Sequence, residues 1–384
     1  IVLFVVLFQI LMSDDERVQY GVSSHGFLPE ACVSRLPSES VFEPLEALAD
    51  ELPRLNREGA LRASVDGLVC DISAEDVAAL GVGELRRAYV VCAFLTHAYA
   101  HARGPRWELI GSNVAAAADA HGASGSAPRI PSALARAVVL VCARIGLPPV
   151  LTAAATDLWN WRLVDPAQPL ALDNLTTITS LTGTPTEVGF HMLPCAMHAL
   201  FAPLLGRVYR APLLDDAALT ALLNELADVL VQCKALFKTV GARVDREVFY
   251  HVLRPLFGGF YPTAATLEGT AAIARPDSWI AAPKGPSAGQ STMFVLIDSL
   301  LGVAHRPGAA SFQDEMLQYM PPRHAQLARD FRRLILARVG AGGVGAGAGA
   351  GEAAAAATAR TFQVSILLFT VTVYANLAHS ITRS

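Results

Sequence analysis

Apolar residues recur at steps of three and four along the middle of the chain. The clearest run is Leu219, Leu222, Leu223, Leu226, Val229, Leu230, Cys233, Leu236 and Phe237. This spacing places the apolar side chains on one face of a helix. Asp215 and Asp216 stand at its start, where the positive end of the helix dipole favours acidic side chains, and Gly241 is expected to end it. The pattern predicts one long helix in this region.

Two further regions carry helix signals. A capped helix is predicted from Ser132 to Gly146, because two prolines follow it directly. Ser73, with Asp76 three residues later, is a second helix start. The apolar positions that then follow one helix face are Leu85, Cys92, Leu95 and Tyr99. No stretch alternates apolar and polar residues at strand length between hairpin turns. The sequence therefore predicts an all-α fold.

Composition divides the chain into parts. Residues 1–12 form an apolar leader that no basic residue precedes and that is too short to span a bilayer. Its role stays open between an extra segment and a targeting segment. Small residues fill 115–128 and predict a connection between domains. We expect a small helical domain over 13–128 and a larger helical domain over 129–384, with a Gly/Ala-rich loop at 340–358.

The charge and the cysteine pattern indicate which binding partners and which cell compartment to expect. The formal net charge is −4 and no long basic run occurs, so we expect no nucleic-acid partner. The six cysteines are widely spaced without a C-x-x-C pair, as is typical of reduced, buried thiols in a cytoplasmic protein. Residues 361–378 are uncharged and near the lower limit of a membrane span. A membrane-anchored protein is therefore the alternative to a cytoplasmic one without membrane association.

Two common motifs are weak evidence for a binding site. Residues 340–345 match the G-x-G-x-x-G pattern of dinucleotide-binding folds, but they lie in a Gly/Ala tract without the preceding strand that the mechanism needs. His97 and His101 share a helix face, yet no H-E-x-x-H glutamate accompanies them, which favours a structural or solvent-facing pair over a zinc site. No nucleophile elbow and no acid–base pair stand out, so the sequence argues against hydrolysis.

Four unusual segments remain. They are LPPVL at 147–151 leading into LWNW at 158–161, FYHVLR at 249–254, GPSAGQS at 285–291 before an apolar helix, and YMPPRH at 319–324. An arginine among aromatic residues suggests a carboxylate partner, because a buried unpaired guanidinium is costly. A small-residue turn allows a flat ligand to approach the backbone. The alternative for each segment alone is a core arginine or an ordinary loop.

Together and in this order, the segments resemble the indoleamine 2,3-dioxygenase family. The resemblance runs from Tyr20 to Pro322, and its most specific pieces are LPPVL…NW, FYHVLR, SAGQS followed by DSLLGV, and YMPP. It implies a small helical domain over a large helical domain that holds haem b. It also implies that haem iron, rather than a catalytic side chain, carries out the chemistry.

The resemblance also implies a set of substrate-binding residues. Arg254 matches the arginine that pairs with the substrate carboxylate, and Phe249 matches an aromatic that stacks near the indole. Phe190 matches a second pocket aromatic, and Phe257 lies about one turn beyond Arg254. The small-residue loop beside the haem corresponds to Ser287, Ala288 and Gly289.

The sequence departs from the family pattern at three of the positions considered. Ala153 stands where tyrosine is frequent, which predicts a roomier pocket, and Pro194 stands where a distal serine is common. Gln363 holds the position of the histidine that binds the iron, although an amide is a poor ligand for haem iron. His379 is the only histidine after residue 324, and it is the other candidate for the iron ligand.

The resemblance implies that the protein opens the indole ring of L-tryptophan, or of a related indoleamine, with O2 to give N-formylkynurenine. That reaction is the first step of the kynurenine pathway. An electron donor would reduce the haem. The alternative is a non-catalytic haem protein that binds or stores oxygen on the same fold.

Overall fold

The computed structural model describes residues 12–101, 128–260, 264–276, 279–303 and 307–342. Most of these residues are helical, which confirms the all-α prediction. The helices before the first gap are α2 (Asp14–Tyr20), α3 (Glu43–Asp50), α4 (Leu52–Glu58), α5 (Leu61–Asp66), α6 (Ala74–Ala79) and α7 (Val82–His101).

The α-helices after the first gap are α8 (Ser132–Ile145), α9 (Pro185–Phe201), α10 (Leu205–Arg210), α11 (Asp216–Lys238), α12 (Val240–Arg243), α13 (Arg246–Val248), α14 (Thr292–Leu300), α15 (Pro307–Met316) and α16 (Pro322–Gly342). Short helical turns connect them. Two are π-helical, η3 (Ala154–Leu158) and η7 (Phe249–Leu253). The others are 3-10 turns, η4 (Leu172–Asn174), η5 (Ala202–Leu204), η6 (Ala211–Leu213), η8 (Arg254–Phe257), η9 (Ala288–Gln290) and η10 (Leu317–Tyr319).

Local signals place several helix ends where the sequence predicts them. Ser73 caps α6: its hydroxyl accepts a hydrogen bond from the Asp76 backbone N–H, and the Asp76 carboxylate accepts one from the Ser73 backbone N–H. α8 ends at Gly146, whose φ of 77° a residue with a side chain adopts with strain. Asp215 caps α11. The predicted end of α11 at Gly241 is wrong, because α11 ends at Lys238 and Gly241 lies inside α12.

Two other details differ from the sequence expectations. Two short strand pairs are present, β1 (Arg129–Ile130) parallel to β4 (Thr266–Leu267), and β2 (Trp161–Leu163) antiparallel to β3 (Leu175–Thr177). Strands of two or three residues are too short for an alternating pattern to reveal. Of the Gly/Ala-rich loop expected at 340–358, residues 340–342 lie at the end of α16, and the rest lies outside the described residues.

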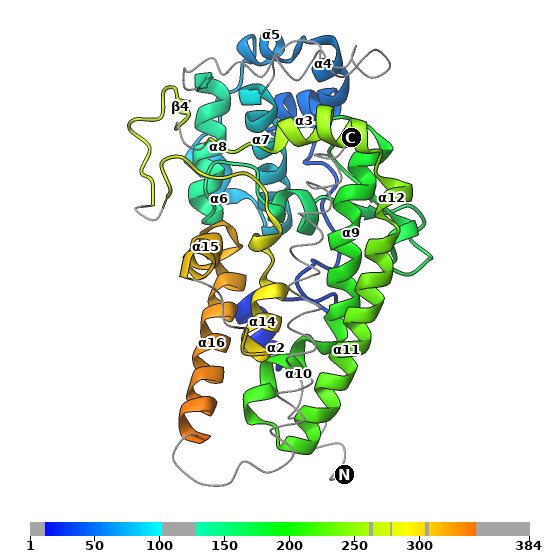
Figure 1. Cartoon of the computed structure of the whole chain (residues 1–384). Coiled ribbons are helices and arrows are strands. Elements are labelled where there is room, and N and C mark those ends of the chain that lie inside the picture. Colours follow the sequence, from blue (N-terminus) through cyan, green and yellow to red (C-terminus); the bar gives the residue numbers. More distant parts are fainter. Residues whose placement is uncertain (1–11, 102–127, 261–263, 277–278, 304–306, 343–384) are drawn as a thin grey trace.

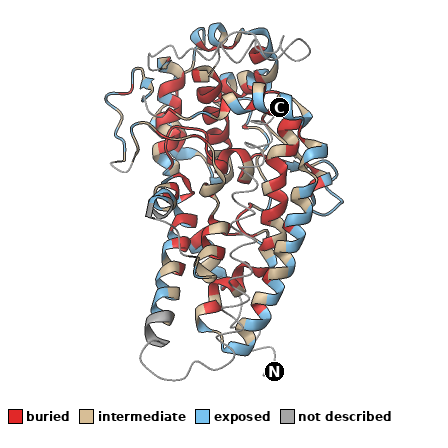
Figure 2. Cartoon of the chain, in the orientation of Figure 1, coloured by how far each residue is buried: buried red, intermediate tan, exposed pale blue. Residues whose placement is uncertain are grey.

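The long helices pack side by side around an apolar interior (Figure 1). α9 and α11 run along one edge, and α16 runs along the opposite edge in this view. Buried residues gather on α7, α8 and the inner face of α9, whereas the outer face of α11 is exposed (Figure 2). α7 and α8 pack against each other across the expected connection at 115–128, and the division into two domains there stays a prediction.

Most of the cysteines lie in the protein interior. All six are free, and Cys92, Cys142, Cys195 and Cys233 are buried. Burial raises the pKa of each of these four thiols, because it disfavours the thiolate. Within the described residues, one helical stretch, Pro185–Leu213, is long and apolar enough to cross a membrane, and just over half of its most apolar 18 residues are buried in the protein.

Candidate functional site

A cavity of about 420 Å³ lies between α9, the π-helical turn η3, the turns η7 and η8, and the loop that leads into α14. Most of the side chains that line it are apolar, among them Leu158, Leu193, Met197, Phe237 and Met293. A mostly apolar cavity with a few polar groups is the usual form of a small-molecule site. Nearly all of the residues that the family resemblance singles out in the described part lie on its wall.

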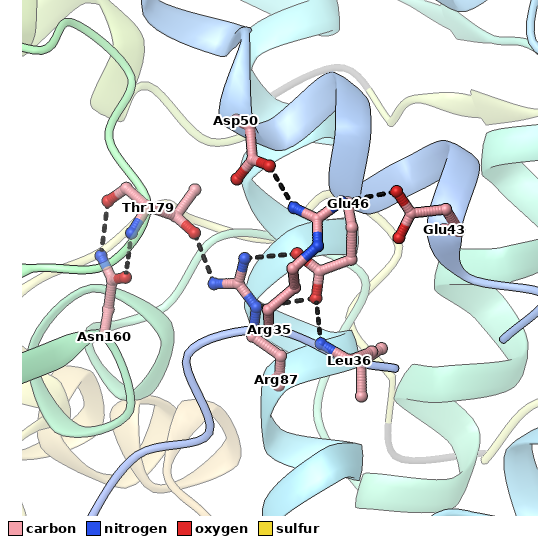
Figure 3. A network of polar contacts seen from close by, with 8 residues as sticks. All are labelled: Arg35, Leu36, Glu43, Glu46, Asp50, Arg87, Asn160 and Thr179. Atoms are coloured by element: carbon pink, nitrogen blue, oxygen red, sulfur yellow. Dashed lines mark hydrogen bonds and ion pairs between the residues drawn. The ribbon is translucent and has the colours of Figure 1, made fainter. Parts of the chain in front are cut away.

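The η3 wall is held in place by a buried polar network (Figure 3). The Arg87 guanidinium on α7 donates to both carboxylate oxygens of Glu46 on α3, and to the Thr179 hydroxyl at 2.6 Å. The Asn160 side chain donates to the Thr179 carbonyl oxygen and accepts from the Thr179 backbone N–H, at 2.8 and 2.7 Å. Asn160 follows η3 by two residues, so the network fixes the segment that carries this wall.

Three aromatic side chains form one side of the cavity. The ring of Phe190 on α9 lies 4.8 Å from that of Phe249 and 5.6 Å from that of Phe257, the second pair being stacked. All three line the cavity. Such a cluster gives a flat ligand ring an apolar surface against which to stack.

Arg254 supplies the positive charge of the site. It begins the turn η8, lines the cavity, and is exposed rather than buried. The described part of the chain offers it no hydrogen bond and no carboxylate, whereas Arg243 nearby in sequence pairs with Asp173. The guanidinium is therefore available to a ligand carboxylate, which it binds in a bidentate geometry.

The small-residue loop contributes two of its three expected residues to the wall. Ser287 and Ala288 line the cavity, but Gly289 is not among its lining residues. A Cβ atom at Gly289 would lie 2.9 Å from the ring of Phe312 and 3.1 Å from Met316, so this glycine allows close packing against α15. Gln290 braces the loop, since its side chain accepts from the Ala153 N–H at 2.8 Å.

The two described departures from the family pattern also lie on the wall. Ala153 and Pro194 both line the cavity. Alanine is smaller than tyrosine, and the roomier pocket expected from this difference stays a prediction. Pro194 lies inside α9, where its ring has no N–H to continue the helix hydrogen bonds.

No acid–base pair is evident from the sequence, but the structure contains one. Asp157 on η3 and His191 on α9 both line the cavity, and Nδ1 of His191 lies 3.1 Å from Oδ1 of Asp157. His198, two helical turns beyond His191, also lines the cavity and is hydrogen-bonded to the Ser291 hydroxyl at 3.3 Å. In the sequence, the sign of this polar site is a pair of histidines seven residues apart on an apolar helix. That spacing puts both histidines on one face of the helix.

Burial controls the protonation of two histidines here. It lowers the pKa of His198 to about 3, with a smaller contribution from His324 nearby. It also lowers the pKa of His324 to about 4, against a hydrogen bond to the Gly21 carbonyl oxygen that acts in the opposite direction. Both rings are therefore neutral in the folded protein at neutral pH.

The other histidine pair, His97 and His101, is not among the residues that line the cavity. His97 is buried, its ring lies 4.8 Å from that of His101, and its Nδ1 accepts from the Leu151 N–H at 3.3 Å. Burial lowers the pKa of His97 well below its usual value. Among the described residues, no group of three or more metal-binding side chains occurs.

Comparison with known families shows to which family the chain belongs. The family model described as indoleamine 2,3-dioxygenase matches residues 16–339. The chain belongs to the indoleamine 2,3-dioxygenase family. As a member, it is a dioxygenase enzyme. Gln363 and His379, the two candidates for the iron ligand, lie beyond the matched region and outside the described residues.

Three relatives show how far the similarity extends. The chain is 30% identical to a 6-hydroxytryptophan 2,3-dioxygenase of Fusarium equiseti, over 86% of this chain and 75% of the relative. It is 28% identical to the indoleamine 2,3-dioxygenase of Saccharomyces cerevisiae, over 80% and 68% of the two chains. It is also 27% identical to a myoglobin of Haliotis diversicolor, over 84% and 79%.

The indoleamine 2,3-dioxygenases are haem-dependent, and the cavity suits such a group. Its mainly apolar wall fits a flat, apolar macrocycle. Two cavity histidines also retain a buried ring nitrogen without a hydrogen-bond partner among the described residues, namely Nε2 of His191 and Nδ1 of His198. The residues present are therefore compatible with haem in this cavity.

Proposed function

We propose that the protein is a haem b dioxygenase that opens the indole ring of L-tryptophan or a related indole amino acid with O2, giving N-formylkynurenine from tryptophan. That product would enter the kynurenine pathway. The observation that carries the proposal is Arg254, an arginine without a carboxylate partner among the described residues, on the wall of an apolar, aromatic-lined cavity.

The chain's own residues would bind and orient the substrate. Arg254 would pair with its carboxylate, and Phe190, Phe249 and Phe257 would hold the indole by stacking. The apolar wall would exclude water from the reacting ring, and fixed orientation itself lowers the barrier. Ser287 and Ala288 would border the haem, which when bound supplies the activation of O2 at iron.

The iron ligand is proposed from the sequence beyond the described part. His379 is the candidate with an imidazole, and Gln363 holds the motif position. An external electron donor would keep the iron reduced. We further propose a cytoplasmic location, with neither a nucleic-acid partner nor a membrane attachment.

The test is an absorption spectrum of the protein after reconstitution with haemin, recorded with and without dithionite and tryptophan. A Soret band and the formation of N-formylkynurenine after reduction are the expected results. A protein that takes up no haem would overturn the proposal. Haem binding with reversible oxygen binding, but without consumption of any indole, would favour the second candidate, an oxygen-binding protein like the Haliotis relative named myoglobin.

A further inference from the structure

The polar pair formed by Asp157 and His191 has hydrogen-bonding capacity that the described protein does not use. The hydrogen bond between Nδ1 of His191 and Oδ1 of Asp157, 3.1 Å long, is the one that each of these side chains makes among the described residues. It leaves the buried Nε2 of His191 without a partner there, and it leaves Oδ2 of the partly exposed Asp157 side chain free to accept a hydrogen bond from a ligand. A buried polar group without a partner is costly, so a ligand that satisfies one gains affinity.

Of the two residues, Asp157 is the more accessible. Its side chain is 18% exposed against 2% for that of His191, and both residues border the cavity. The buried imidazole therefore holds the carboxylate in position, while the carboxylate can contact a ligand. A carboxylate accepts hydrogen bonds and does not donate them when ionised, so it selects a ligand that carries a donor.

The contacts of His191 indicate which part of a ligand meets this pair. The His191 ring lies edge-on to Phe257, at 5.4 Å, and 5.4 Å from the ring of Phe190. These are two of the aromatic side chains against which a flat ring would stack. Phe257 is three residues beyond Arg254 on the same turn η8. With its carboxylate on Arg254 and its ring on the aromatic cluster, a ligand has the polar pair beside its ring.

Resting on the proposed function, we infer that Asp157, held by His191, accepts a hydrogen bond from a hydroxyl group on the substrate ring, so that the preferred substrate is a hydroxylated indole amino acid. An O–H···carboxylate hydrogen bond is short and about twice as strong as a neutral one. Unsubstituted tryptophan has no donor on its six-membered ring, and it would cover the partly exposed carboxylate without giving it a hydrogen bond. The chemistry of the pair therefore favours a ring hydroxyl.

The experiment measures binding to the haemin-reconstituted protein by calorimetry, with tryptophan, 5-hydroxytryptophan and 6-hydroxytryptophan as ligands. We expect at least one hydroxylated ligand to bind about 10- to 150-fold more tightly than tryptophan, the range of a hydrogen bond to a charged group. In Asp157→Val this preference should fall to within about threefold, with the affinity for tryptophan retained. Asp173→Asn changes a carboxylate outside the cavity and should leave all three affinities unchanged.

Two results would overturn the inference. One is a wild-type protein that binds neither hydroxylated ligand more tightly than tryptophan. The other is a variant in which tryptophan and the hydroxylated ligands weaken equally, because Asp157 would then contact the ring N–H or the ammonium group. If Asp157→Val does not fold or load haem, Asp157→Asn decides the matter, since a neutral amide should reduce the preference to an intermediate value.

Turnover separates this inference from the proposed function. If the hydroxylated ligands bind preferentially but no indole is consumed, the dioxygenase proposal fails and the binding role of Asp157 stands. If all three compounds are consumed and bound alike, the proposed function stands and the inference about Asp157 is wrong.

Discussion

Arg87 and Glu46 form a two-point ion pair in the protein interior, with Nε to Oε1 at 2.9 Å and Nη2 to Oε2 at 2.5 Å. The two side chains are 2% and 0% exposed, so neither charge has water to stabilise it. Arg87→Met would leave the Glu46 carboxylate buried without its partner, and we expect it to lower the free energy of unfolding by about 3–5 kcal/mol. Urea denaturation followed by circular dichroism measures this loss.

A surface pair is the matched control. Asp50→Ala removes an exposed carboxylate that pairs with Arg35, and it should change the free energy of unfolding by less than about 1 kcal/mol. A loss below about 1 kcal/mol in Arg87→Met would contradict the structural role of the buried pair.

The second prediction concerns Arg254. A charge-assisted pair with the substrate carboxylate contributes about 1.5–3 kcal/mol, so Arg254→Ala should lower kcat/KM for tryptophan by roughly 10- to 150-fold with haem content unchanged. Tryptamine, which lacks the carboxylate, should lose far less. Arg246→Ala, an exposed arginine on α13, is the control and should behave like wild type. Equal losses for tryptophan and tryptamine would make Arg254 a structural residue.

The third prediction is a loss of stability in acid. In the folded protein burial lowers the pKa of His198 to about 3 and that of His324 to about 4, while in the unfolded chain both titrate near 6.5. The neutral rings therefore stabilise the fold fully above about pH 6.5. This stabilisation is lost as the pH falls from there toward 4 and then 3, because the unfolded chain binds more protons over that window.

Urea midpoints measured from pH 7.5 down to pH 4.5 would show this dependence, with up to about 1.4 kcal/mol per pH unit for each histidine. His324→Gln, which can still donate to the Gly21 carbonyl oxygen, should flatten the profile. His25→Gln, a surface position beside Glu30, should not. A profile that the His324 variant leaves unchanged would exclude that ring as the source.

The fourth prediction concerns the iron ligand. If His379 binds the iron, His379→Ala should abolish tight haem binding and change the Soret band, since imidazole is a much better ligand than the remaining side chains. Gln363→His should then have little effect. The opposite pair of results, an unchanged spectrum in His379→Ala and tighter haem binding in Gln363→His, would move the ligand to the motif position.

The sequence by itself determined the fold class and most helix positions. Capping residues such as Ser73 and Asp215 act on the backbone within three residues, and apolar periodicity is a property of a single segment. Both signals can therefore be recognised in the sequence without the tertiary structure. The end of α11 was missed because a glycine permits a helix to end but does not force it to. The ordered motifs also identified in advance the arginine and the three phenylalanines that the structure gathers on one cavity.

Only the tertiary structure decided which polar side chains meet in the protein interior. Asp157 and His191 are 34 residues apart, and Arg87 and Glu46 are 41 apart, so no local pattern links them. Whether a charged or titratable side chain is buried, and what it meets there, depends on how distant helices pack. The same packing lowers the pKa of His198 and directs Gly289 toward α15 instead of the cavity. Backbone hydrogen bonds and periodicity are local, whereas desolvation and side-chain pairing are properties of the assembled fold.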